Sequence, residues 1–278
     1  MGVVIGIDVG GSTTKIVGIK DNEIQSPMSI TADDPVTSLF GAFGKYIYDN
    51  GVELEDIDQV VLTGVGSAYV NGSLYGLPTK KADEFVANGL GAHHMLDISP
   101  LVVVSMGTGT SFVKIEDNKI EHILGMGMGG GTVNGLSKLL LNVHDMHYVS
   151  ELAQHGDYNK VDLLIGDVCN VDLPGLPLDV TASLFGKADT TSSHEDVASG
   201  IIHMVLQTIG SAAVLCSQGT HIKDFVLIGK LTLMPQCKKV FKDMENLYGV
   251  RFHIPEYSDY CTAIGAALSH IHPMLELQ

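Results

Sequence analysis

The chain has 278 residues, of which 45% are hydrophobic and 17% charged, and this composition excludes a disordered or collagen-like protein. With 16 Lys and Arg against 32 Asp and Glu, the formal net charge of −16 argues against a nucleic-acid or anionic-membrane partner. At about 150 residues per domain, the length suggests two domains.

Neither the cysteines nor the apolar segments indicate secretion or a membrane. The four cysteines, Cys169, Cys216, Cys237 and Cys261, form no CxxC pair, which favours free thiols in a reducing compartment. No targeting signal is visible at the N-terminus. The longest apolar stretch, residues 201–216, is interrupted by polar residues and predicts a buried helix. We therefore expect a cytoplasmic protein.

The first hundred residues read as an α/β half. An apolar run from Val3 to Ile7 predicts a strand, residues 8–13 form a glycine turn, and Thr14 to Ile19 predicts a second strand. Apolar residues at helical spacing predict a helix over 35–50 that Gly51 ends. A short buried strand follows at 60–62.

The rest of the chain begins with the same unit. A buried strand at 101–104 leads into a Gly/Thr turn at 105–111 and another strand at 112–115. Further on, the patterns predict strands at 120–124, 225–228 and 250–254 and helices at 132–143, about 193–219, 235–248 and 263–270.

The recurrence of strand, glycine turn and strand predicts two related halves, although chance similarity of two Gly/Thr turns is the alternative. The order of strands and helices indicates an α/β fold. No low-complexity linker separates the halves, so we place the boundary at Ser99-Pro100. The predicted domains are residues 1–99 and residues 100–278.

The first turn has the residues of a phosphate site. Gly10 and Gly11 let backbone amides approach a phosphate closely, Ser12 and Thr13 add hydroxyls, and Lys15 adds a positive charge. The alternative is an ordinary hairpin turn in which Asp8 only caps a strand end.

A glycine run at 127–131 leads directly into the helix at 132–143. Free amides and the helix dipole at such an entry favour nucleotide phosphates, and the alternative is a flexible loop over a helix cap. The GxxxxGK sequence of a P-loop is absent. A Rossmann fold is disfavoured because the first turn leads into a strand rather than a helix.

Three phosphate-directed elements on two similar halves resemble the actin, hexokinase and Hsp70 superfamily. Within it, the chain resembles the type II pantothenate kinases over nearly its whole length, in order and spacing. The motifs that carry this resemblance are Ile5 to Lys15, Leu62-Thr63-Gly64, Gly107 to Ser111, Gly129 to Thr132, Ala153 to Asp157, Asp179 to Gly186 and Ala263 to Ala266.

The resemblance implies two ribonuclease-H-like domains with ATP in the cleft between them. It implies ATP-dependent phosphorylation of the primary hydroxyl of pantothenate, the first step of coenzyme A biosynthesis, by a homodimer that uses Mg²⁺. The general base of the family falls on Glu84, which accepts the proton of the attacking alcohol. Asp8 would take part in catalysis and hold Mg²⁺ through water.

The resemblance also assigns the binding residues. Glu84, Thr108 and His122 would contact the substrate. The nucleotide would be lined by Asp8, Gly10, Gly11, Ser12, Thr13, Thr14, Lys15, Thr108, Gly129, Gly130, Gly131, Thr132 and Asn134.

One departure from the family bears on the substrate. Where the family has an arginine that helps to hold the substrate, this chain has His122, and its one arginine is Arg251. A bidentate clamp on a carboxylate is an arginine function, so other donors must hold the carboxylate of pantothenate. The substrate could therefore be a relative such as pantetheine.

Two further function classes stay open. Activators of hydroxyacyl-CoA dehydratases, which are ATPases with an iron–sulfur cluster, share a segment similar to 8–15. The spacing of the four cysteines does not clearly reproduce their paired cysteines. A nucleotide or acyl-CoA sensor that kept the fold without turnover is the other class.

Overall fold

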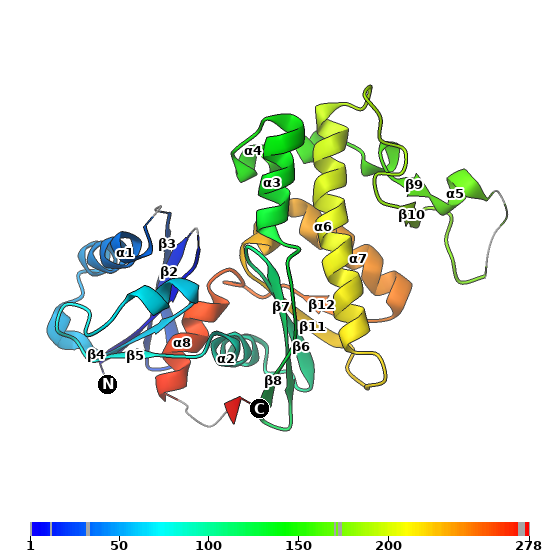
Figure 1. Cartoon of the computed structure of the whole chain (residues 1–278). Helices are drawn as coiled ribbons and strands as arrows, with labels where there is room; N and C mark the ends of the chain where they lie inside the picture. Colours follow the sequence, from blue (N-terminus) through cyan, green and yellow to red (C-terminus); the bar gives the residue numbers. More distant parts are fainter. Residues whose placement is uncertain are drawn as a thin grey trace.

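The structure is a computed structural model that describes residues 2–11, 13–31, 34–169, 171, 174–271 and 276–277. Two mixed sheets form its two halves (Figure 1). The first has the order β3 (Glu23–Ile30), β2 (Thr14–Lys20), β1 (Val3–Val9), β4 (Ile57–Thr63) and β5 (Thr79–Lys81). The second has the order β12 (Arg251–His253), β11 (Asp224–Ile228), β6 (Leu101–Met106), β7 (Thr110–Glu116), β8 (Lys119–Met126) and β13 (Glu276–Leu277).

The two sheets share one topology. In each half an antiparallel meander comes first, β1-β2-β3 or β6-β7-β8, and a later strand pairs parallel with the first strand of that meander. These later strands are β4 beside β1 and β11 beside β6, and a fifth strand adds parallel to each. The predicted α/β fold of two related halves is confirmed.

The helices join the strands and cover the sheets. Their bounds are α1 Pro35–Asn50, α2 Glu84–Leu96, α3 Gly130–Leu141, α4 Met146–His155, α5 Ile165–Val168, α6 His194–Cys216, α7 Pro235–Tyr248 and α8 Cys261–Ile271. The helix predicted to reach Gly219 ends earlier, because the amide and hydroxyl of Ser217 both donate hydrogen bonds to the Val214 carbonyl. Short 3₁₀ turns lie at Leu54–Asp56, Val65–Tyr69, Tyr158–Lys160 and Lys230–Leu233.

Three apolar clusters hold these layers together. The first lies between α1 and the outer face of the first sheet, and the second lies between the second sheet and helices α3, α4, α6 and α7. The third joins the facing sides of the two sheets through α2 and α8, which lie between them (Figure 1).

Helix α8 crosses the predicted domain boundary. It follows the last strands of the second half, yet it packs on β1, β2 and β4 of the first sheet and along α2. The helices approach so closely that a Cβ on Gly265 would overlap the Ala87 carbonyl, and one on Gly91 would overlap that of Cys261. The division at Ser99-Pro100 remains a prediction, and α8 belongs spatially to the layer shared by both halves.

Helix α6 carries the apolar stretch at 201–216. At 23 residues, with a mean hydropathy of 1.5 over an 18-residue window, it passes the length and composition test for a membrane span. However, 61% of that window is buried inside the protein, against α3, α4 and α7. The stretch is part of the helix that the sequence predicted over about 193–219, and it is mostly buried as expected.

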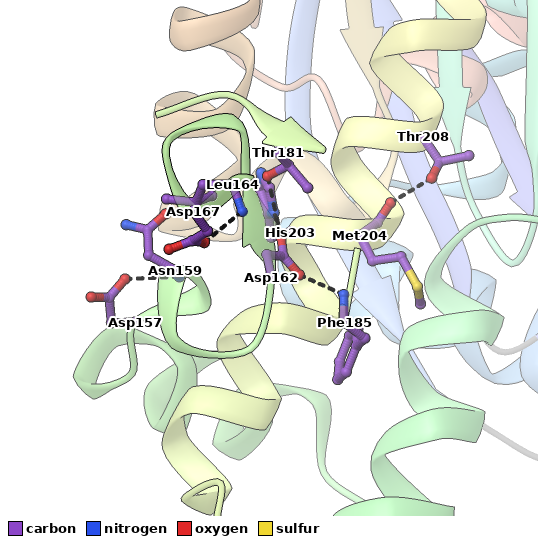
Figure 2. A network of polar contacts seen from close by, with 10 residues as sticks. All are labelled: Asp157, Asn159, Asp162, Leu164, Asp167, Thr181, Phe185, His203, Met204 and Thr208. Atoms are coloured by element: carbon purple, nitrogen blue, oxygen red, sulfur yellow. Dashed lines mark hydrogen bonds and ion pairs between the residues drawn. The ribbon is translucent and has the colours of Figure 1, made fainter. Parts of the chain in front are cut away.

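A buried carboxylate closes the loop that carries β9 (Leu163–Leu164), α5 and β10 (Thr181–Ser183). Asp162, fully buried, pairs with His203 Nδ1 on α6 at 2.7 Å and accepts the Phe185 amide at 2.8 Å (Figure 2). The Tyr158 ring stacks on His203 with centroids 3.7 Å apart. Asp162 thus ties both ends of the loop to the core.

Candidate active site

The first glycine turn places two charged side chains on one face of the first sheet. Asp8 and Lys15 are register partners in the hairpin, and such partners project from the same face. Their side chains form an ion pair, with Lys15 Nζ 3.5 Å from Asp8 Oδ2, and both are largely buried. The Gly10 amide donates to the Thr13 carbonyl at 3.1 Å, which closes the turn. Ser12 lies outside the described residues.

The side chain of Thr14 lies on the opposite face. Because successive residues of a strand alternate between faces, Thr14 points away from the side that Lys15 occupies. It is 1% exposed, and its hydroxyl accepts a hydrogen bond from Ser38 of α1 at 2.7 Å. The structure therefore does not bring this predicted ATP-binding side chain to the site.

The end of β4 borders the Asp8 carboxylate. Thr63 is the register partner of Asp8, and Gly64 follows it with a φ of 81°. A Cβ on Gly64 would lie 2.5 Å from Asp8 Oδ1. Both the backbone conformation and this close approach require glycine.

Glu84 is the first residue of α2, which begins where β5 ends. The Asp83 carboxylate caps the helix by accepting the amides of Phe85 and Val86 at 2.8 and 3.1 Å. Burial raises the pKa of Glu84, the negative charges of Asp8 and Asp83 raise it further, and Lys15 opposes them. The predicted base, metal-binding carboxylate and lysine thus share one electrostatic environment.

The second turn is bonded to the start of α3. The Gly130 amide donates to the Gly107 carbonyl at 2.8 Å, and the Gly131 amide donates to the Thr108 carbonyl at 2.9 Å. The prediction that these helix N-terminal amides are free for phosphate is wrong, because both are paired. They fix the shape of the second turn, because a helix N-terminus must pair its amides with some acceptor.

The remaining predicted nucleotide residues lie beside this junction. The Thr132 hydroxyl accepts the Gly129 amide at 3.2 Å and donates to the Gly127 carbonyl at 3.1 Å. Asn134 follows in the first turns of α3 and is half-buried. The glycine run is therefore an ordered helix entry, rather than the flexible loop considered as the alternative.

The first and second turns face each other across the two halves. A Cβ on Gly11 would lie 3.9 Å from Thr108 Oγ1, a distance of ordinary contact. The hydroxyl of Thr108 therefore opposes the turn that follows Asp8. Glycine-rich turns from both halves thus meet at one place, as a nucleotide between them requires.

His122 lies next to the helix that carries Glu84. The imidazole of His122, on β8, stacks on the ring of Phe85 with centroids 4.0 Å apart and planes at 14°. The histidine is exposed, and Phe85 is the neighbour of Glu84 in the chain. The structure thus brings the two predicted substrate residues Glu84 and His122 to one region.

One charged residue that sequence reasoning did not assign to the site, Asp259, interacts with the charge of Lys15. Burial raises the pKa of Asp259, and the charges of Lys15 and Lys230 oppose that rise. The Gly229 amide donates to the Ser258 carbonyl at 3.0 Å, which places the loop before α8 beside the turn of Lys230. No local motif marks Asp259, since its proximity to Lys15 arises only from the fold.

The described residues suit Mg²⁺ held mainly by water and phosphate. They contain no group of three or more His, Cys, Asp or Glu side chains that would form a complete metal cage. Mg²⁺ usually keeps several waters and takes one or two carboxylates from the protein. The single carboxylate of Asp8, beside the phosphate turn, fits that pattern.

A family model described as Fumble matches residues 68–268. The chain belongs to this family. Type II pantothenate kinases of Staphylococcus aureus strains USA300 and NCTC 8325 are each 28% identical to it over 275 residues, or 94% of this chain and 97% of theirs. Membership of the Fumble family, that of the type II pantothenate kinases, confirms the resemblance drawn from the motifs.

Solved structures show the same fold as this Fumble protein. The activator of 2-hydroxyisocaproyl-CoA dehydratase from Clostridium difficile, with bound ADPNP, has a TM-score of 0.68 at 17% identity, over 96% of this chain and 93% of its own. Component A of (R)-2-hydroxyglutaryl-CoA dehydratase from Acidaminococcus fermentans has a TM-score of 0.68 at 19% identity, over 96% and 97%. These likenesses show that the chain shares the fold of the two dehydratase components.

Proposed function

We propose that the protein transfers the γ-phosphate of ATP to the primary hydroxyl of pantothenate. The observation that carries the proposal is the position of Glu84 at the start of α2, in the field of Asp8 and Lys15. Membership of the Fumble family supports the acceptor, and the facing turns at Gly11 and Thr108 support the nucleotide.

Each of the site residues has a separate role in the reaction. The hydroxyl oxygen of pantothenate attacks the γ-phosphorus while the bond to the bridging oxygen of ADP breaks, and the Glu84 carboxylate accepts the hydroxyl proton. Lys15 and the amides of the first turn offset the charge of the transferred phosphoryl group. Asp8 would hold Mg²⁺ through water, and the ion would neutralise the phosphate oxygens.

The direct test is Mg·ATP-dependent phosphorylation of pantothenate, followed by mass spectrometry, with pantetheine in a parallel reaction. We expect one phosphate added to pantothenate per ADP formed. Turnover of pantetheine alone would show that the protein is a kinase and that pantothenate is not its substrate. Turnover of neither by folded, ATP-binding protein would contradict the kinase proposal and favour a sensor.

Replacement of His122 by arginine should improve the binding of a carboxylate substrate. A guanidinium can keep the stack on Phe85 and add two charge-assisted hydrogen bonds, so we expect the KM for pantothenate of His122→Arg to fall about tenfold. Steady-state kinetics checks this. Pantetheine, which has no carboxylate, and the exposed His221→Arg should show no change. An unchanged KM for pantothenate would show that position 122 does not contact the substrate carboxylate.

The iron–sulfur activator function has less support. The similarity to dehydratase activators is below 20% identity and shows the fold alone. Cys237 and Cys261 are buried, and burial raises the pKa of Cys237 to about 12, so neither thiol is ready to bind a cluster. Cys169 and Cys216 are partly exposed.

A homodimer in the cytoplasm completes the proposal. Large apolar side chains are exposed on three helices, Leu139 on α3 at 79%, Tyr148 on α4 at 51% and Leu215 on α6 at 70%. Exposed apolar groups on neighbouring helices suit a second copy of the chain. The four free cysteines support a reducing compartment, and the net charge of −16 disfavours nucleic acid and anionic membranes.

A further inference from the structure

A buried amide one turn from Glu84 lacks a partner. The side chain of Asn88 is 0% exposed, and its Nδ2 has no hydrogen-bond partner among the described residues. A buried donor without a partner lowers the stability of the fold, so a protein keeps one only where another property compensates. Its Oδ1 accepts the hydroxyl of Thr262 at 2.7 Å, which anchors the amide to α8.

The spacing places this donor beside the proposed base. Residues four apart on a helix are neighbours on one face, and helical side chains lean toward the N-terminal turn. The side chain of Asn88 therefore leans toward the turn of α2 that contains Glu84. The Glu84 carboxylate is mostly buried and accepts no hydrogen bond from any residue that the structure describes. An unpaired donor and an unpaired acceptor thus lie one turn apart.

The charges around Glu84 make such a donor useful. Asp8 and Asp83 repel the carboxylate, Lys15 attracts it, and the His122 ring lies on the neighbouring Phe85. A neutral N–H donor orients a carboxylate without adding another charge to this group. It also determines which carboxylate oxygen is left to face the acceptor hydroxyl.

We infer that Asn88 is a positioning residue for Glu84. The Thr262 hydroxyl holds Asn88 Oδ1, and Nδ2 donates to the Glu84 carboxylate when the acceptor alcohol is bound. The role rests on the proposed function, since it needs Glu84 to act as a base. Through the hydrogen bond of Asn88 to Thr262, this role also links Glu84 to α8, the helix that follows the loop of Asp259.

The test compares Asn88→Leu, which keeps the volume but removes the donor, with the wild-type protein. We expect kcat for pantothenate phosphorylation to fall about tenfold, as for the loss of a charge-assisted hydrogen bond, with an unchanged KM for ATP. Thr262→Val should lower kcat in the same direction by loosening the anchor, and Thr262→Ser should restore it. Ser137→Ala, which removes a buried hydroxyl that also lacks a partner among the described residues, should leave kcat unchanged.

A double-mutant comparison separates positioning from a general structural role. In a Glu84→Gln protein, adding Asn88→Leu should lower the residual rate less than twofold, because the carboxylate through which Asn88 acts is already gone. A wild-type kcat in Asn88→Leu, or an equal tenfold loss in both backgrounds, would overturn the role alone. No turnover by the wild-type protein would instead overturn the proposed function, and this role with it.

Discussion

Glu84→Gln should lose about a thousandfold in kcat while ATP still binds with unchanged affinity, because a positioned base contributes roughly 10²–10⁴-fold to such reactions. Glutamine keeps the size of the side chain and its place at the start of α2, but it cannot accept the proton of the acceptor alcohol. Coupled ADP release with saturating pantothenate measures kcat. A kcat within threefold of the wild type would rule out Glu84 as the base.

The pH dependence of kcat/KM provides a second test of Glu84. Burial and the neighbouring carboxylates raise the pKa of Glu84, so the acid limb of kcat/KM should lie at higher pH than for an exposed glutamate. A raised carboxylate pKa in the folded state means that ionised Glu84 destabilises the fold as pH rises through that pKa. Glu84→Gln should therefore be at least as stable as the wild type at neutral pH, which makes it a folded control.

Gly265→Val should lower the free energy of unfolding by about 4 kcal/mol or more, an effect on the scale of the most damaging single substitutions. A Cβ at this position would overlap the carbonyl oxygen of Ala87, and backbone atoms cannot rotate aside as a side-chain end can. Helices α2 and α8 would have to separate. Urea denaturation followed by circular dichroism measures the loss.

The matched control for Gly265→Val is Gly41→Ala in α1. Beyond its chain neighbours and the local helix backbone, no atom of the described residues lies within 4 Å of a Cβ added to this glycine. Alanine should therefore stabilise the protein by roughly 0.5–1 kcal/mol. Comparing the two variants separates the effect of replacing a helical glycine from the effect of a steric clash between α2 and α8. If Gly265→Val unfolded at the wild-type urea concentration, the close packing of α8 on α2 would be wrong.

Local patterns were sufficient for the duplicated fold and for part of the site. Strand alternation alone puts Asp8 and Lys15 on one face of a hairpin, and Gly51 ends α1 where predicted. The same alternation places Thr14, the neighbour of Lys15, on the opposite face of the sheet, which α1 covers. Its inclusion among the ATP-binding side chains followed the motif rather than the strand geometry.

Other parts of the site depend on contacts that no local pattern encodes. Asn88 and Thr262 are 174 residues apart in the chain and meet only because α8 returns to α2. The Gly130 and Gly131 amides are paired because the second turn folds onto them, so their availability could not be judged from helix position alone. Glu84 itself was found through the family, since a helix-start carboxylate is common.

The place of α8 also bears on the order in which the chain can fold during synthesis. The inner face of the first sheet, with Val4, Val17 and Val61, is covered by a helix that begins at Cys261. Until residues 261–271 leave the ribosome, that face stays open to water, even though all strands of its sheet were made long before. A nascent chain must therefore keep its N-terminal third incomplete through most of translation, and completion of both halves becomes one late event.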